Sequence, residues 1–199
     1  MPNWCDNNVT LKGEKEVLDW IEEIQFDFKK LLPVPEYPKF KLKTQYWDWD
    51  WCKENWGTKW EADNPAFDRK SDKELFINFQ TAWGPPEGIY GSLIGFKLDI
   101  EASYIEEGMM FYGTYRTNKI MLDDIPFRID LNNYHYRIPS YDREVSKEDN
   151  LKEMMDLIEH KEDKELLKQF VEEYIDCRHG YLEQLDSDDE CGRPIFQRL

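Results

Sequence analysis

The sequence predicts an α+β fold in which helices cover one face of an antiparallel β-sheet. Two segments each show the hydrophobic pattern of a strand, a helix and a strand, one over about residues 7–32 and one over about residues 74–116. Two such units in succession are typical of the split βαβ, or ferredoxin-like, arrangement. A charged helical segment follows them. We therefore expect a ferredoxin-like domain over residues 1–139 and an acidic helical extension over residues 140–199.

The first unit begins with a strand that ends at a glycine. Residues 7–13 (NNVTLKG) are short, β-branched and roughly alternating in polarity. Residues 14–24 (EKEVLDWIEEI) place apolar side chains at helical spacing opposite acidic ones, which predicts an amphipathic helix. Phe26 and Phe28 then alternate with polar residues before a proline at position 33, which predicts a second short strand.

The second unit follows a polar, tryptophan-rich insertion at about residues 33–73. Residues 74–83 (ELFINFQTAW) alternate as a strand does, and a Pro-Pro pair then precedes a predicted helix. Residues 97–116 predict a hairpin that turns at Glu106-Glu107-Gly108. Residues 125–139 (IPFRIDLNNYHYRIP) are expected to add one more strand.

The extension predicts two amphipathic helices that pack as a hairpin. The first begins near Ser146, which forms a near capping box with Asp149, and the second has apolar residues spaced from Leu166 to Ile175. Residues 141–199 contain 18 acidic and 9 basic side chains, a net charge of -9 out of the chain's -16.

Composition argues against several classes of function. A net charge of -16 repels nucleic-acid backbones and anionic membranes, so we expect no direct binding to either. No apolar run reaches the roughly 18 residues that span a bilayer, and the first residues lack the features of a secretory signal, so we expect a cytoplasmic protein. The 4 cysteines are far apart and form no C-x-x-C motif. We expect no metal site, no cofactor and no catalytic residues.

Residues 46–60 (YWDWDWCKENWGTKW) hold five of the 8 tryptophans. On a helix, Trp47 and Trp51 share a face and Trp49 points nearly opposite, so at least one of them should be partly exposed. Gly57 suits the end of that helix. One interpretation is that these tryptophans are buried and only pack the insertion against the rest of the domain. The other is an aromatic recess with a few polar groups, which would hold a nucleotide base, an arginine side chain or a proline-rich loop.

The candidate ligand-binding residues of this recess come from the insertion, the first strand and the second unit. They are Trp4, Asn7, Trp56, Thr58, Lys59, Trp60, Thr81, Trp83, Tyr104, Glu106 and Tyr112. For Glu106 two interpretations remain open, a solvated residue of the hairpin turn or a general base beside the recess.

Four motifs occur in a fixed order along the chain. They are MPNWCDNNVTLKG at the start, WGTKW at residues 56–60, F-x-T-A-W-G-P-P at residues 79–86 and Y-I-E-E-G-x-x-F-Y-G at residues 104–113. In combination they resemble the YubB family of plasmid- and phage-borne proteins over roughly the first 115 residues. The resemblance implies a ferredoxin-like fold and an origin on a bacterial mobile element. It supplies no catalytic residues, and it does not extend to the helical tail.

These observations predict a non-enzymatic binding protein of a mobile element. Its expected partner is a host protein or a nucleotide-like ligand, and its context suggests interference with host defence. Two alternatives stay open. The acidic tail could imitate DNA or bind a basic protein through Asp186, Asp188, Asp189 and Glu190, or the protein could be a small nucleotide-processing hydrolase that uses Glu106.

Overall fold

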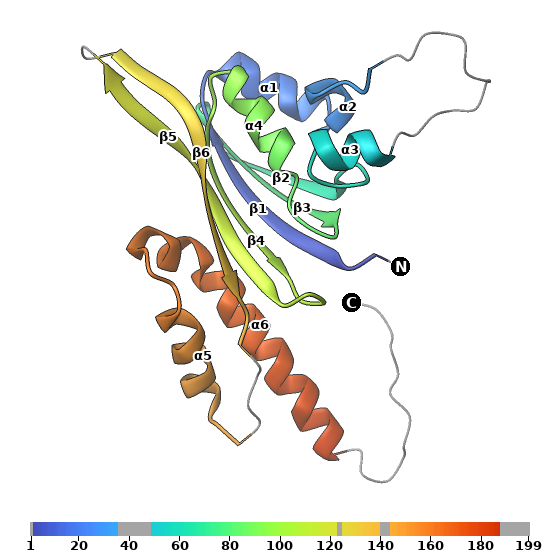
Figure 1. Cartoon of the computed structure of the whole chain (residues 1–199), viewed down its shortest axis with the longest axis vertical. Helices are drawn as coiled ribbons and strands as arrows, with labels where there is room; N and C mark the ends of the chain where they lie inside the picture. The colour runs from blue at the N-terminus through green and yellow to red at the C-terminus, as the bar shows by residue number, and fades with distance from the viewer. Residues whose placement is uncertain (1, 36–48, 123–124, 140–143, 188–199) are drawn as a thin grey trace, which may run out of the picture. The chain divides into compact units, whose positions relative to one another are not determined.

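The computed structural model describes residues 2–35, 49–122, 125–139 and 144–187 (Figure 1). Its internal contacts divide the chain into two compact units, Met1–Ile138 and Pro139–Leu199.

The first unit contains a six-stranded antiparallel sheet with the strand order β2-β3-β1-β4-β5-β6. Its elements are β1 (Trp4–Lys12), α1 (Lys15–Glu23), α2 (Phe28–Leu31), α3 (Trp49–Asn55), β2 (Asp63–Ser71), β3 (Glu74–Ala82), α4 (Glu87–Gly95), β4 (Asp99–Glu106), β5 (Phe111–Leu122) and β6 (Ile125–Arg137). The order β1-α1-β2-β3-α4-β4 is that of a ferredoxin-like fold. This confirms the predicted fold class, and β5 and β6 extend the sheet beyond β4.

Helices α1 and α4 lie on the same face of the sheet (Figure 1). Strand β1 buries alternate side chains, including Val9 and Leu11, in one core with Leu18 and Ile21 of α1 and Leu93 of α4. The strand period of two and the helix period of 3.6 thus direct apolar side chains to the same interior. The predicted first strand and both predicted long helices of this unit are confirmed.

The predicted strand at Phe26 and Phe28 is wrong. Gln25 and Phe26 have positive φ angles of 56° and 54°, so the chain turns sharply there. Asp27 then accepts hydrogen bonds from the backbone N–H groups of Lys29 and Lys30, which caps the short helix α2. Both phenylalanines are buried, but in a turn and a helix.

The strand that completes the motif is β2, inside the predicted insertion. Within the part of the chain that the structure describes, β2 pairs only with β3 and forms an edge of the sheet, where Pro65 is tolerated because no partner needs its missing N–H. The sequence of β2 alternates only weakly between apolar and polar residues, because Phe67 is its one large apolar residue.

The second unit contains helices α5 (Lys147–Asp156) and α6 (Lys161–Ser187), which contact each other. Ser146 caps α5 by accepting a hydrogen bond from the N–H of Asp149 at 3.1 Å. The two predicted C-terminal helices are therefore confirmed. Across the described residues, no helix combines the length and the apolar character needed to cross a membrane.

Candidate ligand-binding site

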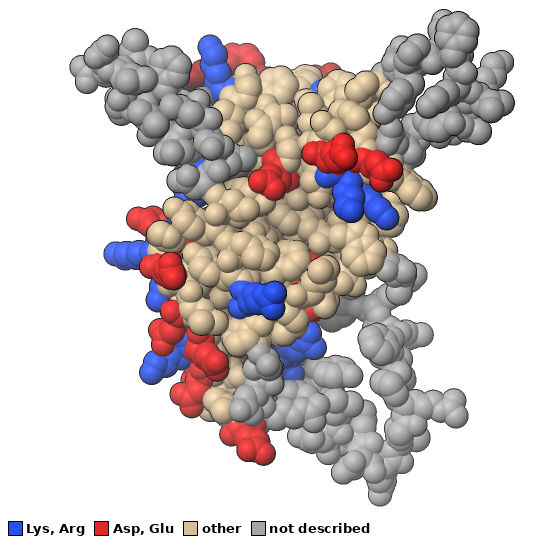
Figure 2. Space-filling model, viewed as in Figure 1, with Lys and Arg blue, Asp and Glu red and all other residues tan. Residues whose placement is uncertain are grey.

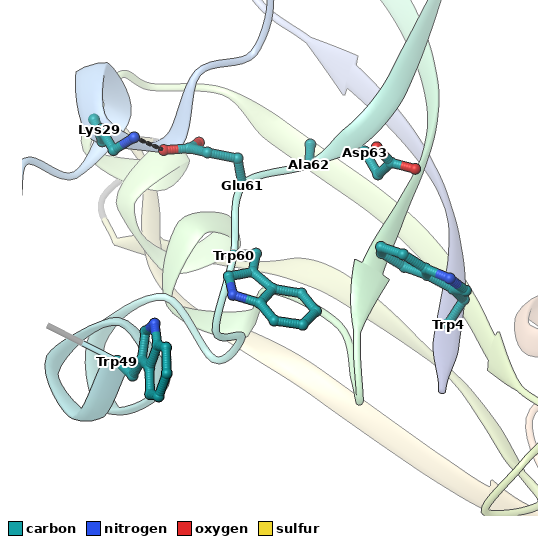
Figure 3. A pocket seen from close by; sticks show the side chains of 7 residues that line it. All are labelled: Trp4, Lys29, Trp49, Trp60, Glu61, Ala62 and Asp63. Carbon is teal, nitrogen blue, oxygen red and sulfur yellow. Dashed lines mark ion pairs between the residues drawn. The ribbon is translucent and has the colours of Figure 1, made fainter. Parts of the chain in front are cut away.

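An open recess lies beside the first residues of β1 and β2 (Figure 3). Its volume is about 410 Å³, which is within the range of small-ligand sites. Residues from β1, α2, α3 and the segment that enters β2 line it: Trp4, Lys29, Trp49, Trp60, Glu61, Ala62 and Asp63. We call it the tryptophan recess.

Three indole rings form one side of the tryptophan recess. Trp49 is 56% exposed, Trp4 38% and Trp60 37%. The ring centroids of Trp4 and Trp60 lie 6.5 Å apart with an interplanar angle of 49°. Figure 3 shows Trp60 between Trp49 and Trp4. Three large apolar side chains thus remain open to solvent next to one another, and exposed apolar patches often mark a binding site.

Two carboxylates form the other side. One oxygen of Glu61 accepts a hydrogen bond from the N–H of Phe28 at 2.7 Å, and the other lies 3.3 Å from the ammonium nitrogen of Lys29. Burial raises the pKa of Glu61, and the nearby charge of Asp27 acts in the same direction. The Asp63 carboxylate is half-buried and accepts a hydrogen bond from the side-chain amide of Asn64 at 2.9 Å.

The recess is presented by a segment anchored in the core. Trp56 is fully buried, and its indole N–H donates to the carbonyl of Leu32 at 2.8 Å. Gly57 follows with a φ of 87°, and the hydroxyl of Thr58 donates to the carbonyl of Ala82 at 2.9 Å. These contacts fix the backbone immediately before Trp60. Trp56 is therefore an anchor, whereas Trp60 forms part of the exposed wall.

A family model described as the ferredoxin-like domain in Api92-like protein matches residues 46–156. The chain belongs to this family. A search of solved structures also finds protein api92 from Yersinia pseudotuberculosis, with 10% identity, 67% of this chain and 98% of that chain covered, and a TM-score of 0.44. No curated protein matches the chain.

The family match covers only part of the recess of this Api92-like chain. Trp49 and residues 60–63 lie inside the matched segment, whereas Trp4 and Lys29 lie before it. The match begins before α3, runs through the sheet from β2 to β6 and ends at the last residue of α5.

Asn7 and Thr81, predicted as polar groups of the recess, are fully buried elsewhere in this Api92-like chain. The Asn7 amide donates to the Thr81 hydroxyl at 2.8 Å and accepts from the hydroxyl of Tyr90 at 3.1 Å. They fasten β1 to β3 and α4. Thr58 is likewise buried. None of these three residues lines the recess, and each has a structural role instead.

Two further candidates lie near the surface but outside the lining. The ammonium of Lys59 lies 5.5 Å from the centroid of the Trp49 ring, on which it makes a cation–π contact. Trp83 is 44% exposed and has a φ of 73°, and its N–H donates to the carbonyl of Asn3 at 2.9 Å.

The candidates of the second hairpin do not reach the recess either. Glu106 is fully buried and accepts hydrogen bonds from the N–H groups of Gly108 and Met109 at 2.9 and 2.5 Å, so its carboxylate holds the turn. Tyr104 is buried, and its hydroxyl lies 3.0 Å from Nδ1 of His135. Tyr112 is buried too, which raises its pKa to about 12.

Sequence reasoning missed five lining residues as candidates, namely Lys29, Trp49, Glu61, Ala62 and Asp63. Residues 61–63 follow Trp60 directly, so their position along the chain was the available signal. Lys29 gave no signal, because only the folded chain brings α2 next to the segment that enters β2.

The acidic tail carries the other predicted site. Asp186 belongs to α6, and Asp188, Asp189 and Glu190 lie outside the described residues. On the face that Figure 2 displays, Lys and Arg side chains are interspersed with Asp and Glu side chains. Within the described part of the chain, no group of three or more His, Cys, Asp or Glu residues could hold a metal ion.

Proposed function

We propose that this chain is a non-enzymatic binding protein whose tryptophan recess holds a flat group of a partner. The observation that carries the proposal is the exposure of Trp4, Trp49 and Trp60 side by side, in a domain that buries Trp56 completely. The resemblance to the YubB family adds an origin on a plasmid or phage. The partner is then a component of the bacterial host, and the outcome of binding is interference with host defence.

Energetics support a binding role for the exposed rings. Covering apolar surface releases about 25 cal/mol per Å², and a well-oriented aromatic contact adds about 0.5–1.5 kcal/mol. Trp4 lies in strand β1, Trp49 lies in helix α3 and Trp60 follows the anchored residues Trp56 to Thr58, so little backbone entropy is lost when a partner binds. In contrast, the charged lining groups Lys29 and Glu61 already contact each other, and Glu61 also accepts the N–H of Phe28.

Indole N–H resonances of ¹⁵N-labelled protein test this function. We would titrate adenosine monophosphate, a blocked arginine peptide and a proline-rich peptide separately. We expect at least one of them to shift the signals of Trp4, Trp49 and Trp60, and to leave that of the buried Trp56 unchanged. Signals are assigned by single Trp→Phe variants. If no probe moves any of the three exposed signals, the proposed function is wrong.

A further inference from the structure

We propose that the tryptophan recess binds the guanidinium group of an arginine side chain on a partner protein. This inference rests on the binding function proposed above and names the chemical group that the recess takes. It follows from three properties of the lining: the arrangement of the indole faces, the position of Asp63, and the charge balance.

The indole faces suit a flat cation. The face of an indole carries negative electrostatic potential, and a cation within about 6 Å of its centroid is attracted to it. Trp4 and Trp60 line the same recess, with their ring centroids 6.5 Å apart and their planes tilted by 49°, so a cation in the recess lies near two indole rings. A cation–π contact is already present at the rim of the recess, where the Lys59 ammonium lies 5.5 Å from the centroid of the Trp49 ring.

Asp63 provides the acceptor that a guanidinium needs. Figure 3 shows its carboxylate on the side of the recess where Trp4 lies. Only one of its oxygens, Oδ2, accepts a hydrogen bond from another described residue, the side chain of Asn64. A guanidinium has five N–H donors in a planar fork and stacks on aromatic rings, whereas an ammonium is a compact and strongly hydrated charge. The lining therefore favours arginine over lysine.

The charge balance disfavours the nucleotide alternative. The lining contains Glu61, Asp63 and Lys29, a net formal charge of -1, and the Lys59 ammonium at the rim already contacts the Trp49 ring. The ammonium of Lys29 lies 3.3 Å from a Glu61 oxygen, so a phosphate would have to compete with this carboxylate and would face Asp63 as well. The chain as a whole carries -16, which attracts cations and repels nucleotides over long range.

The same argument selects a side chain in a protein over the free amino acid. Free arginine carries an α-ammonium and an α-carboxylate, and the carboxylate is repelled by the chain's net charge of -16. In a peptide that group is a neutral amide. The recess is also open, because each of its three indoles is at least 37% exposed, so a residue projecting from a protein surface can enter it.

The test compares two blocked peptides that differ only at one residue, arginine or citrulline. Citrulline has nearly the same shape and no charge, and adenosine monophosphate is the third probe. A single side chain binds weakly, in about the millimolar range, so indole N–H shifts are the suitable readout. We expect the arginine peptide to shift the signals of Trp4 and Trp60 with an affinity about tenfold above that of the citrulline peptide.

Matched variants locate the interaction. Asp63→Asn should weaken binding of the arginine peptide about tenfold, since a charge-assisted hydrogen bond is lost. Asp68→Asn is the control, because it removes the same charge from the same strand outside the lining. Trp60→Ala should abolish the shifts of Trp4, whereas Trp83→Ala, which removes a similarly exposed indole outside the recess, should preserve them.

Two results would overturn the inference. If the citrulline peptide or adenosine monophosphate binds as well as the arginine peptide, the recess does not select a cation, but it remains a binding site and the proposed function stands. If none of the three probes, nor the proline-rich peptide, shifts Trp4, Trp49 or Trp60, both the inference and the proposed function are wrong.

Discussion

At the scale of single residues, the interior of the sheet depends on one amide side chain. Asn7 donates to the carbonyl of Cys5 and to the hydroxyl of Thr81, and it accepts from the hydroxyl of Tyr90. All of these groups are inaccessible to water, so none of the lost bonds could be replaced by solvent.

We therefore expect Asn7→Ala to lower the free energy of unfolding by about 2–4 kcal/mol, because the Tyr90 hydroxyl is left buried without its acceptor. Urea unfolding followed by circular dichroism measures this. The control is Asn8→Ala on the same strand, which removes a partly exposed side chain that accepts from Asn78 and should cost less than about 1 kcal/mol. Equal losses in the two variants would contradict the structural role given to Asn7.

The two tryptophans of the WGTKW motif should differ strongly in how much they contribute to stability. Trp56 is fully buried, and its ring centroid lies 5.7 Å from that of Phe28 in an edge-to-face arrangement, whereas Trp60 is 37% exposed. Trp56→Ala should lower the free energy of unfolding by about 3–5 kcal/mol through the cavity that it leaves. Trp60→Ala should cost clearly less in the same urea experiment, since its site is open to water. A larger loss for Trp60 would make it an anchor and weaken the case for a binding wall.

At the scale of secondary-structure elements, α3 and α4 approach each other closely at a glycine. A Cβ atom at Gly88 would lie 1.7 Å from the carbonyl oxygen of Asn55, and the Gly88 N–H donates to the carbonyl of Trp56 at 3.1 Å. This contact holds the end of α3, and with it the segment that leads to Trp60, against the start of α4.

Gly88→Ala should therefore separate the two helices and cost about 1–3 kcal/mol or more in stability. Gly91→Ala is a matched control in α4, because a Cβ atom there would have no neighbour within 4 Å. It should stabilise the protein by about 0.5–1 kcal/mol, since glycine is a poor helix former. Melting temperatures of the two variants give the comparison, and a neutral Gly88→Ala would show that α3 does not pack tightly on α4.

At the scale of the whole molecule, the buried tyrosines make stability depend on alkaline pH. Burial raises the pKa values of Tyr90, Tyr104, Tyr112 and Tyr115 above the ordinary value. The folded protein therefore keeps these phenol protons when the unfolded chain, with tyrosine pKa values of about 10, has lost them. Their contribution is fully present below about pH 10 and is lost as the pH rises further.

We expect these four groups to lower the free energy of unfolding by about 5.5 kcal/mol per pH unit between about pH 10 and pH 12, which is about 1.4 kcal/mol for each group. Urea unfolding at several alkaline pH values measures the slope, and tyrosinate absorbance shows when the phenols ionise. Tyr90→Phe should reduce the slope by about 1.4 kcal/mol per pH unit. If all 11 tyrosines of the chain ionise near pH 10 while the fold persists, the prediction fails.

The local sequence patterns were sufficient for much of the fold. β1, α1 and β3 each have a clear hydrophobic period, Pro85-Pro86 precedes α4, and Ser146 marks the start of α5. These signals depend only on neighbouring residues. The same patterns wrongly predicted a strand at Phe26, which is buried in a turn. They also missed β2, because its own sequence has a weak strand pattern and it becomes a strand by pairing with β3.

The sequence by itself determined the fold class, the C-terminal helices, and the exposure of at least one tryptophan in the cluster. Only the tertiary structure decided which tryptophans are exposed and which polar groups accompany them. Asn7 was expected in the recess and is buried, whereas Lys29 joins Glu61 across 32 residues of sequence. The reason is physical. Hydrophobic periodicity reports which face of an element is apolar, but the burial of a polar side chain depends on partners that are distant along the chain.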